Sequence, residues 1–370
     1  MNMFNPDETA AALLHHRSDQ LAQGDAIRPP IVAASLYKLS GQPSGDHQYG
    51  RWTNPTWTAT EEALSILEGA AVVSFPSGMA AIAAVLLSQL RAGHRLLLPS
   101  DGYYTSRLLA DRYLAPNGVE VDQCPVVELA DRAADGYDLV FIETPSNPTL
   151  DLCDLQATIE AAKSGGALTV VDNTTMTPLG QRPFDHGADV VVSSDTKAIN
   201  GHSDVLFGHV ACTEPELVDA IGQWRTVTGA IPGHFESWLV HRGLETFELR
   251  FSRMCQTART LAERLEGHQR LRSVRYPGLP SHAQHHLASR QMRSGGTLVG
   301  LEFESEEAAD HFAELARYVV PATSFGGTHT TADRRARWGD QVAPGFVRLS
   351  VGCEPTEELW KDISTALERL

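Results

Sequence analysis

Residues 168–197 read LTVVDNTTMTPLGQRPFDHGADVVVSSDTK and contain two short apolar runs, LTVVD and DVVVSS, each followed by polar residues. Both runs are rich in valine and do not alternate between apolar and polar positions. Strands of this kind lie in mostly parallel sheets that helices cover on both faces. The stretch therefore predicts an α/β fold.

The same pattern recurs on both sides of this stretch. Further strands are predicted at VVSF (72–75), RLLLP (95–99), VEVDQC (119–124), DLVFIE (138–143) and VLFGHVACT (205–213). Polar segments follow several strands directly, among them SDGYYT, TPSNPT, DNTT and SDTK. Ligands of open α/β sheets bind beyond the carboxyl ends of the strands, so we expect these segments to face one site.

Three regions differ in character along the chain. Residues 1–55 are punctuated by proline and glycine and are predicted to form an extended N-terminal arm that contacts a neighbouring subunit. Residues 56–245 carry the strands above and are predicted to form a large domain. An amphipathic stretch over roughly 236–265 then leads to the strand-like runs TLVGLEFE and FVRLSVG, which predict a smaller C-terminal α/β domain over 246–370.

Composition narrows the class of protein. Acidic residues outnumber basic ones by 46 to 30, so the formal net charge is −16, which disfavours nucleic acid and anionic membranes as partners. The five cysteines are scattered singly without a C-x-x-C pair. No run is long enough to span a membrane, and the N-terminus lacks the pattern of a signal peptide. We expect a cytoplasmic protein.

Lys197 ends the run SSDTK. A lysine at a strand end, beside the hydroxyls of Ser194 and Thr196, can act as an amine nucleophile toward a carbonyl if its pKa is lowered. The two hydroxyls flank position 195 at alternate positions and could donate to an anion from one side. The alternative is that Lys197 is a surface lysine in a turn and that Ser194 and Thr196 are ordinary turn-forming residues.

Three further features point to a site near this lysine. Ser77 and Gly78 in FPSGMAAI begin an alanine-rich helix, whose free amides and dipole attract phosphate, although an ordinary helix cap fits as well. Asp172 ends a buried strand and needs a cation, which a protonated pyridine nitrogen would supply; a helix cap is the alternative. Tyr103 offers a ring for stacking and a phenol for proton transfer; the alternative is that its ring only packs against neighbours.

Lysine, carboxylate, aromatic ring and phosphate cradle together match what pyridoxal 5′-phosphate (PLP) requires. The run SSDTKAINGHSD (193–204) resembles the S-x-T-K-x-x-x-G-H-S-D stretch of the Cys/Met-metabolism PLP enzymes, which include cystathionine γ-synthase, cystathionine γ- and β-lyases and methionine γ-lyase. YGRWTNPT, SGMAAI, ETPSNPTLDLCD, VVDNT, YPGLPSH, TSFGGTHT and VRLSVGCE extend the resemblance over nearly the whole chain. It implies PLP-dependent transferase fold type I and a homotetramer, a dimer of dimers with shared active sites.

The resemblance assigns roles by position. It implies that Lys197 is the Schiff-base lysine and moves protons at Cα, that Asp172 is the partner of the pyridinium nitrogen, and that Tyr103 stacks on PLP and assists proton transfer. It implies a phosphate cradle made of Ser77, Gly78, Met79, Ser194 and Thr196. Tyr49 and Arg51 of YGR resemble a pair that reaches the neighbouring subunit's cofactor phosphate.

Substrate contacts are implied at the other end of the chain. Arg348 in FVRLSVG resembles the residue that binds the substrate α-carboxylate, a bidentate task that suits a guanidinium group. The alternative is a surface arginine on an edge strand. Asn147 of PSNP and Ser324 of TSFGG resemble further substrate or cofactor contacts.

The cofactor motifs serve two reactions, hydrolysis to a 2-oxo acid and ammonia by a lyase, or capture of a thiol by a synthase. The short chain most resembles bacterial members called cystathionine γ-lyase, which implies γ-elimination of L-cystathionine to cysteine, 2-oxobutyrate and ammonia. γ-Replacement on an O-acyl-L-homoserine with a thiol is the runner-up. His329 stands where many cystathionine enzymes of the family carry Glu, so how the distal amino group is held stays open.

Other hypotheses have less support. A catalytically silent PLP-fold binding protein would lack the cofactor lysine, its carboxylate partner or the substrate arginine, and the sequence has all three. A nucleotide-binding Rossmann protein would carry G-x-G-x-x-G after the first strand, which is absent from the sequence. His282, His285 and His286 in SHAQHH have a spacing that suits zinc on a helix, but no acidic residue lies close in sequence, so we expect no metal.

Overall fold

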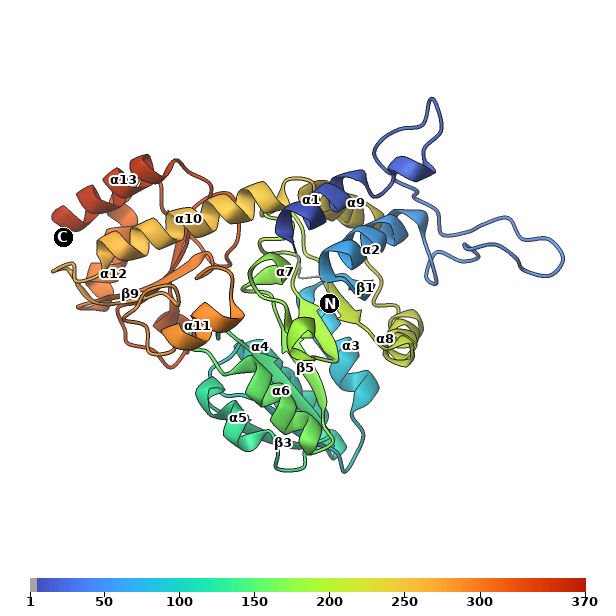
Figure 1. Ribbon diagram of the computed structural model, residues 1–370, viewed down its shortest axis with the longest axis horizontal. Helices are drawn as coiled ribbons and strands as arrows, with labels where there is room; N and C mark the ends of the chain where they lie inside the picture. The colour runs from blue at the N-terminus through green and yellow to red at the C-terminus, as the bar shows by residue number, and fades with distance from the viewer. Residues whose placement is uncertain (1–4) are drawn as a thin grey trace. The chain divides into compact units, whose positions relative to one another are not determined.

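The computed structural model describes residues 5–370. The main sheet contains, in spatial order, β1 (Ala71–Phe75), β7 (Gly208–Cys212), β6 (Val190–Ser193), β5 (Leu168–Asp172), β4 (Leu139–Glu143), β2 (Arg95–Pro99) and β3 (Glu120–Cys124). The second sheet contains β10 (Val320–Pro321), β11 (Thr331–Arg334), β12 (Phe346–Ser350), β9 (Leu298–Phe303) and β8 (Leu271–Arg275). Helices alternate with many of the strands (Figure 1), so the predicted α/β fold is confirmed.

The chain forms two compact units. The first unit extends to Gln89 and resumes over Asp189–Glu248, and the second comprises Leu90–Ala188 and Leu249–Leu370. The division into an N-terminal arm, a large domain and a small domain, with boundaries near residues 55 and 245, stays a prediction.

The strands of the first unit are not all parallel. Strand β7 runs antiparallel to both β1 and β6, with Ser193 of β6 and Ser74 of β1 each paired with His209. Residues 194–207, which join β6 to β7, contain no helix. A parallel pair needs a crossover connection, usually a helix, so this connection returns the chain antiparallel and the sheet is mixed.

Helices of the first unit surround these strands. They are α1 (Pro6–His15), α2 (Pro55–Glu68), α3 (Gly78–Gln89), α8 (Pro215–Thr228) and α9 (His234–Leu244). Residues 21–53 form neither helix nor strand apart from a bridge between Leu36 and Tyr49, and Figure 1 shows most of this segment as a long blue loop. Ile27 and Leu36 on this segment are largely exposed.

The second unit has a parallel sheet region. Strand β2 runs parallel to β3 and β4, and β4 runs parallel to β5. Helices α4 (Tyr104–Leu109), α5 (Leu129–Arg132), α6 (Leu155–Ser164) and α7 (Thr177–Gly180) accompany these strands. Ile159 of α6 packs in one buried cluster with Val140 and Val171, which explains why both strands read as continuous apolar runs.

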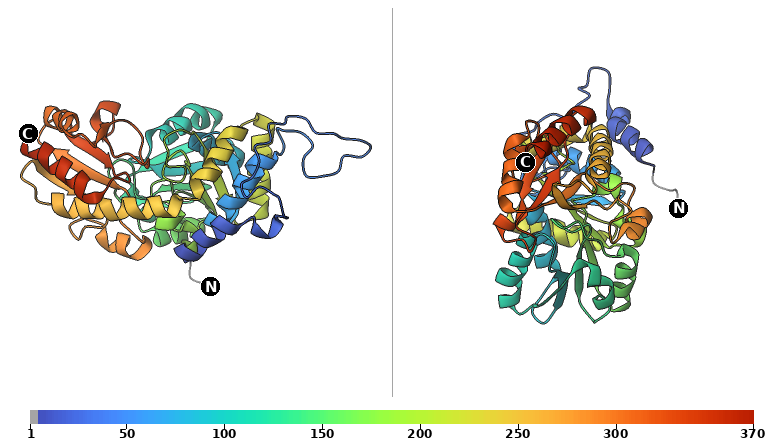
Figure 2. Two further views of the ribbon diagram at one scale, coloured as in Figure 1. Left: turned by 90° about the horizontal axis from the view of Figure 1, so that it is seen from above. Right: turned by 90° about the vertical axis from the view of Figure 1, so that its left-hand side faces the viewer.

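The C-terminal part of the second unit is built on the five-stranded sheet. Its helices are α10 (Phe247–Leu265), α11 (His285–Gln291), α12 (Glu306–Leu315) and α13 (Thr356–Glu368). Leu261 of α10, Phe312 of α12 and Ile363 of α13 lie in one buried cluster with Val299 and Leu349 of the sheet, and Figures 1 and 2 show the three helices along it. Across residues 5–370, none of the helices combines the length and apolar character that a membrane-spanning segment needs.

Candidate active site

The start of α3 forms part of the candidate site in the first unit. The Oγ of Ser77 accepts a hydrogen bond from the amide of Ala80 at 3.1 Å and so caps the helix. Gly78 follows, and a Cβ at this position would lie 2.6 Å from the Cβ of Ser194. Glycine is therefore required for the helix to approach the turn that carries Ser194. Met79, half-buried, is the next residue of the same helical turn.

The segment with Lys197 follows β6 as a tight turn. The amide of Lys197 donates to the carbonyl of Ser194 at 3.1 Å, and the amide of Gly201 donates to the carbonyl of Lys197 at 2.8 Å. The Oγ1 of Thr196 donates to the carbonyl of Phe207 at 3.1 Å and accepts from its amide at 3.0 Å. Because a hydroxyl has one hydrogen, donation from Thr196 to a phosphate would require this hydrogen to turn away from Phe207.

Tyr49 and Arg51 also belong to the first unit. The Nη1 of Arg51 donates to the carbonyl of Thr226 near the end of α8 at 2.6 Å. Its guanidinium group lies 5.3 Å from the centroid of the Tyr49 ring, and this ring is 38% exposed. A cation at the end of α8 is favoured by the helix dipole.

Two carboxylates end neighbouring strands in the second unit. Asp172 of β5 and Glu143 of β4 are paired in register, and both side chains are buried. The Oδ1 of Asp172 accepts from the amide of Thr174 at 3.0 Å. Burial and the nearby charge of Asp172 raise the pKa of Glu143 to about 8 although two backbone amides donate to it. The pair therefore favours a cation or a bound proton beside it.

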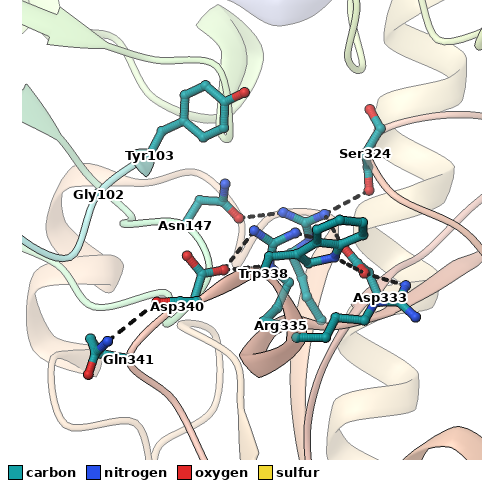
Figure 3. Close-up of polar contacts among 12 residues, drawn as sticks. Gly102, Tyr103, Asn147, Ser324, Asp333, Arg335, Trp338, Asp340 and Gln341 are labelled. Atoms are coloured by element: carbon teal, nitrogen blue, oxygen red, sulfur yellow. Dashed lines mark hydrogen bonds and ion pairs between the residues drawn. The ribbon is translucent and has the colours of Figure 1, made fainter. Parts of the chain in front are cut away.

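Glu143 also organises two residues that the sequence singled out. Its Oε2 accepts from the amide of Tyr103 at 2.7 Å, and its Oε1 accepts from the amide of Asn147 at 3.0 Å. Tyr103 precedes α4 and its ring is half-buried (Figure 3). Sequence reasoning did not identify Glu143. The available signal was its position at the end of a buried strand, which it shares with Asp172.

Arg348 of β12 is nearly completely buried. Its Nη1 donates to the Oδ1 of Asn147 at 2.5 Å, and its Nη2 donates to the backbone carbonyl of Ser324 at 2.9 Å. Its Nε is buried and has no hydrogen-bond partner among residues 5–370. Burial and the neighbouring Arg335 lower the pKa of Arg348 to about 10, so it stays charged at neutral pH. A buried charged donor of this kind is suited to an anionic ligand.

A cluster of charged side chains that sequence reasoning missed adjoins this arginine, because Asp333 lies 3.5 Å from its Nη2. Figure 3 shows Asp333, Arg335 and Asp340 of this cluster. The Oδ2 of Asp333 accepts from Arg335 at 2.6 Å, and its Oδ1 accepts from Arg337 at 2.8 Å and from the indole of Trp338 at 2.9 Å. The Nε of Arg335 donates to Asp340 at 2.8 Å. Burial opposes ionisation of Asp333, but the bonds from Trp338 and Arg335 lower its pKa.

Ser324 contributes through its backbone. Its carbonyl accepts from Arg348, its φ of 72° lies in the left-handed region that non-glycine residues seldom adopt, and its side chain is exposed. His329 lies in the same loop and is exposed, with Nδ1 3.4 Å from the hydroxyl of Thr328. The structure thus brings Asn147, Ser324 and Arg348 together and places His329 in the loop that follows Ser324.

Two of the three histidines of SHAQHH contact backbone groups close to them in sequence. The Nδ1 of His285 lies 3.1 Å from the carbonyl of Pro277, and the Nδ1 of His282 accepts from the amide of Gln284 at 3.2 Å. Within residues 5–370, no group of three or more His, Cys, Asp or Glu side chains is arranged to hold a metal ion.

Each unit offers groups that fit PLP. In the first unit, Ser77 and the α3 N-terminus approach Ser194 so closely that a Cβ at Gly78 would overlap it, and the amides of a helix N-terminus lack partners within the helix and suit a phosphate. Lys197 lies in the same turn as Ser194. In the second unit, the buried carboxylate of Asp172 beside Glu143 suits a protonated ring nitrogen.

Comparison with known proteins gives the family. The model for Cys/Met metabolism PLP-dependent enzymes matches residues 8–368. A Streptomyces coelicolor protein with the provisional name cystathionine γ-lyase is 47% identical over 347 residues, which are 92% of this chain and 88% of that protein. A cystathionine β-lyase of Lactococcus lactis is 38% identical over 361 residues, 93% of this chain and 94% of that protein.

A solved structure supports the same relationship. Cystathionine γ-synthase from Xanthomonas oryzae pv. oryzae, in complex with aminoacrylate and cysteine, matches with a TM-score of 0.93 at 36% identity, over 98% of each chain. The relatives thus include lyases and a synthase, and the match extends over nearly the full length. The chain therefore belongs to the Cys/Met metabolism PLP-dependent enzyme family, and its cofactor is pyridoxal 5′-phosphate.

Proposed function

We propose that this enzyme is a carbon–sulfur lyase that cleaves L-cystathionine by γ-elimination. The reaction consumes one water and yields cysteine, 2-oxobutyrate and ammonia. The observation that supports an amino-acid substrate is the buried Nε of Arg348, which has no hydrogen-bond partner in the described part of the chain and suits an α-carboxylate. The 47% identity to the Streptomyces coelicolor relative supports a lyase.

The residues that hold the cofactor are proposed from their positions in the family's motifs. We propose that Lys197 binds PLP covalently through its amine and that Asp172 holds a proton on the ring nitrogen. The phosphate would be bound by Ser77, Gly78, Met79, Ser194 and Thr196. The close approach of Gly78 and Ser194 supports this cradle, because a phosphate needs donors from both segments at once.

Proton transfers are assigned to residues of this chain. When bound, PLP draws electrons from the substrate Cα and makes its hydrogen removable. The amine of Lys197 would accept this proton at Cα and would not return it to that atom, because C2 of the product 2-oxobutyrate carries no hydrogen. Tyr103 stacks on the ring and assists proton transfer, and the bond from its amide to Glu143 supports a fixed position for its backbone.

Substrate orientation is assigned to the second unit. We propose that Arg348 binds the α-carboxylate while Asn147 and the carbonyl of Ser324 hold the guanidinium plane in place. Two bonds to fixed oxygens reduce the freedom of a long side chain, so less entropy is lost when the carboxylate binds.

The assembly and location are proposals as well. We propose a homotetramer, a dimer of dimers in which Tyr49 and Arg51 reach the neighbouring subunit's cofactor phosphate. The exposed apolar side chains of residues 21–53, among them Ile27 and Leu36, support an interface along the N-terminal arm. A cytoplasmic location is proposed from the unpaired pattern of cysteines.

A second function is favoured by a specific observation. The Xanthomonas oryzae γ-synthase matches this chain with a TM-score of 0.93, so γ-replacement on an O-acyl-L-homoserine with a thiol is the alternative. The two reactions share the residues that bind PLP and the α-carboxylate.

A product panel separates these functions. The purified enzyme is incubated with L-cystathionine, homocysteine, cysteine, methionine, and O-acyl-L-homoserine with and without cysteine. A lyase releases 2-oxobutyrate and cysteine from cystathionine. Release of 2-oxobutyrate only from acylated homoserine, together with conversion of cysteine to cystathionine, would show a synthase. Absence of turnover on every substrate in PLP-loaded protein would contradict both and indicate a silent binding protein.

A further inference from the structure

A buried set of charged side chains lies beside the Lys197 turn, and the proposed mechanism does not use it. The Nδ1 of His209 lies 2.8 Å from Oδ1 and 3.0 Å from Oδ2 of Asp195. The Nε2 of His209 lies 3.0 Å from Oε1 of Glu68. All three side chains are buried, and they come from β7, from the turn after β6 and from the last residue of α2.

The position of His209 between two carboxylates favours a protonated ring that donates from both nitrogens. A ring nitrogen beside an ionised carboxylate acts as the donor, because that carboxylate can only accept. Burial alone would favour the neutral ring, but Asp195 and Glu68 together raise the pKa of His209 to about 10. Glu68 stands at the C-terminal end of α2, where the helix dipole disfavours an anion, and the His209 donor offsets this.

Asp195 lies in the middle of the proposed cofactor-binding segment. It stands between Ser194 and Thr196 and two residues before Lys197. Asp195 is fully buried, whereas Ser194 and Thr196 are half-buried. Within this turn Asp195 faces inward to His209, whereas its two neighbours stay partly accessible to solvent.

His209 is also linked along the chain to the second wall of the phosphate cradle. Gly208 precedes it, and a Cβ on Gly208 would lie 2.6 Å from both Cα and N of Gly78. The start of β7 therefore packs against the start of α3. His209 bonds the lysine turn on one side and, through its neighbour Gly208, adjoins the helix N-terminus on the other.

We propose that His209 is a positioning residue: its hydrogen bonds to Asp195 hold the Ser194–Lys197 turn in the arrangement that binds the cofactor. This inference rests on the proposed role of Lys197. Glu68 holds the ring from the opposite side and prevents it from turning away from Asp195. Loss of the bond to Asp195 should weaken PLP binding itself, beyond any loss of fold stability.

Two variants of His209 each keep one half of the arrangement. In His209→Asn the amide nitrogen replaces Nδ1 and can still donate to Asp195. In His209→Gln the amide nitrogen replaces Nε2 and can still donate to Glu68, but the bond to Asp195 is lost. The dissociation constant of PLP is measured by titrating each apo protein, and the midpoint of thermal unfolding of each apo protein is measured beside it.

The expected outcome is a split between the two variants. His209→Gln should raise the PLP dissociation constant about tenfold or more, since a charged hydrogen bond is lost, and His209→Asn should change it by less than about threefold. Equal dissociation constants in the two variants would overturn the proposal, because a purely structural link would only lower the unfolding midpoint. If His209→Gln does not fold, Asp195→Ala is used, which removes the acceptor of the His209 bond, and an unchanged constant there overturns the proposal as well.

A separate control tests the function on which the inference rests. After borohydride reduction and denaturation, PLP should stay attached to the wild type and be lost from Lys197→Ala, as measured by intact mass. If wild-type protein does not retain PLP, the proposed role of Lys197 fails. If it does retain PLP and the His209 variants do not split, only the positioning proposal fails.

Discussion

The carboxylate of Asp333 lies 3.5 Å from Nη2 of Arg348 and accepts hydrogen bonds from Arg335 and Arg337 as well. Two anions, Asp333 and the Asp340 that bonds to Arg335, thus stand against three guanidinium groups. The local charge stays positive around Arg348, whose Nε has no hydrogen-bond partner within the residues that the structure describes. An anionic ligand is therefore attracted to a position where the protein itself has not neutralised the arginines.

Arg348→Lys should raise KM for cystathionine by about tenfold or more. The guanidinium group can bind a carboxylate with two parallel bonds while Asn147 and Ser324 hold it in place, and an ammonium group cannot. Steady-state kinetics measure the change. The control is Arg337→Lys, since Arg337 bonds to the same Asp333 but its side chain is 37% exposed. Equal KM values in both variants and the wild type would contradict carboxylate binding by Arg348.

Asp333→Asn should lower the free energy of unfolding by about 3 kcal/mol, because Arg335 and Arg348 would be left buried with less compensating charge. The pKa of Asp333 is lowered in the folded state, so its stabilising effect is present above the unfolded pKa of about 4 and is lost as pH falls below it. Urea unfolding at several pH values measures both. The stability difference between variant and wild type should shrink under acid, and a constant difference would count against the ion cluster.

Gly78→Ala should weaken PLP binding and lower the free energy of unfolding by about 1–3 kcal/mol, because the new Cβ would lie 2.6 Å from the Cβ of Ser194. PLP titration and thermal unfolding measure these effects. Gly222→Ala in α8 is the matched control, because no atom lies within 4 Å of its added Cβ. That change should raise stability by about 0.5–1 kcal/mol through helix propensity. Similar effects of the two substitutions would argue against close packing at Gly78.

Acid should loosen α1. The Nε2 of His241 in α9 lies 3.3 Å from the Nε2 of His16, just after α1. Burial, followed by the charges of His16, Arg17 and Arg28, lowers the pKa of His241 to about 4. The unfolded chain takes up this proton near pH 6.5, so stability is full above about pH 6.5 and is lost as pH falls toward the folded value.

His241→Gln should therefore flatten the dependence of the unfolding midpoint on pH below about pH 6.5. Limited proteolysis at residues 16–20 gives a second measurement, since cleavage should increase under acid in the wild type. A wild-type midpoint that does not change over this range would contradict a buried neutral histidine at this position.

The strands were predictable because each depends on a local pattern. The runs LTVVD and RLLLP match β5 and β2 in full, and the polar segments that follow β4 and β5 carry Asn147 and Thr174. The direction of β7 was not predictable in this way, because it depends on whether residues 194–207 form a crossover helix. Strand β8 was missed since its sequence, LRSVR, has few apolar residues and is only half-buried.

The charged clusters were beyond sequence reasoning for a different reason. The segment TADRRARWGD reads as an exposed charged loop, yet Asp333 and Arg335 are buried because they neutralise each other. Likewise His209 and Asp195 look unremarkable 14 residues apart, and only the turn between β6 and β7 brings them together. Buried charge depends on partners that are distant in sequence, whereas a strand depends on its own residues.

The antiparallel return of β7 has a consequence for how the protein opens. The segment with Lys197 leaves the sheet from β6 and re-enters it in β7, and the amide of Thr196 donates to the carbonyl of Phe207 at 3.2 Å just before that strand begins. Both ends of the segment are thus anchored in the same antiparallel pair, β6 and β7. Its amides should exchange with solvent only when β6 and β7 separate, so hydrogen exchange at Thr196 and Val210 should follow a single opening event.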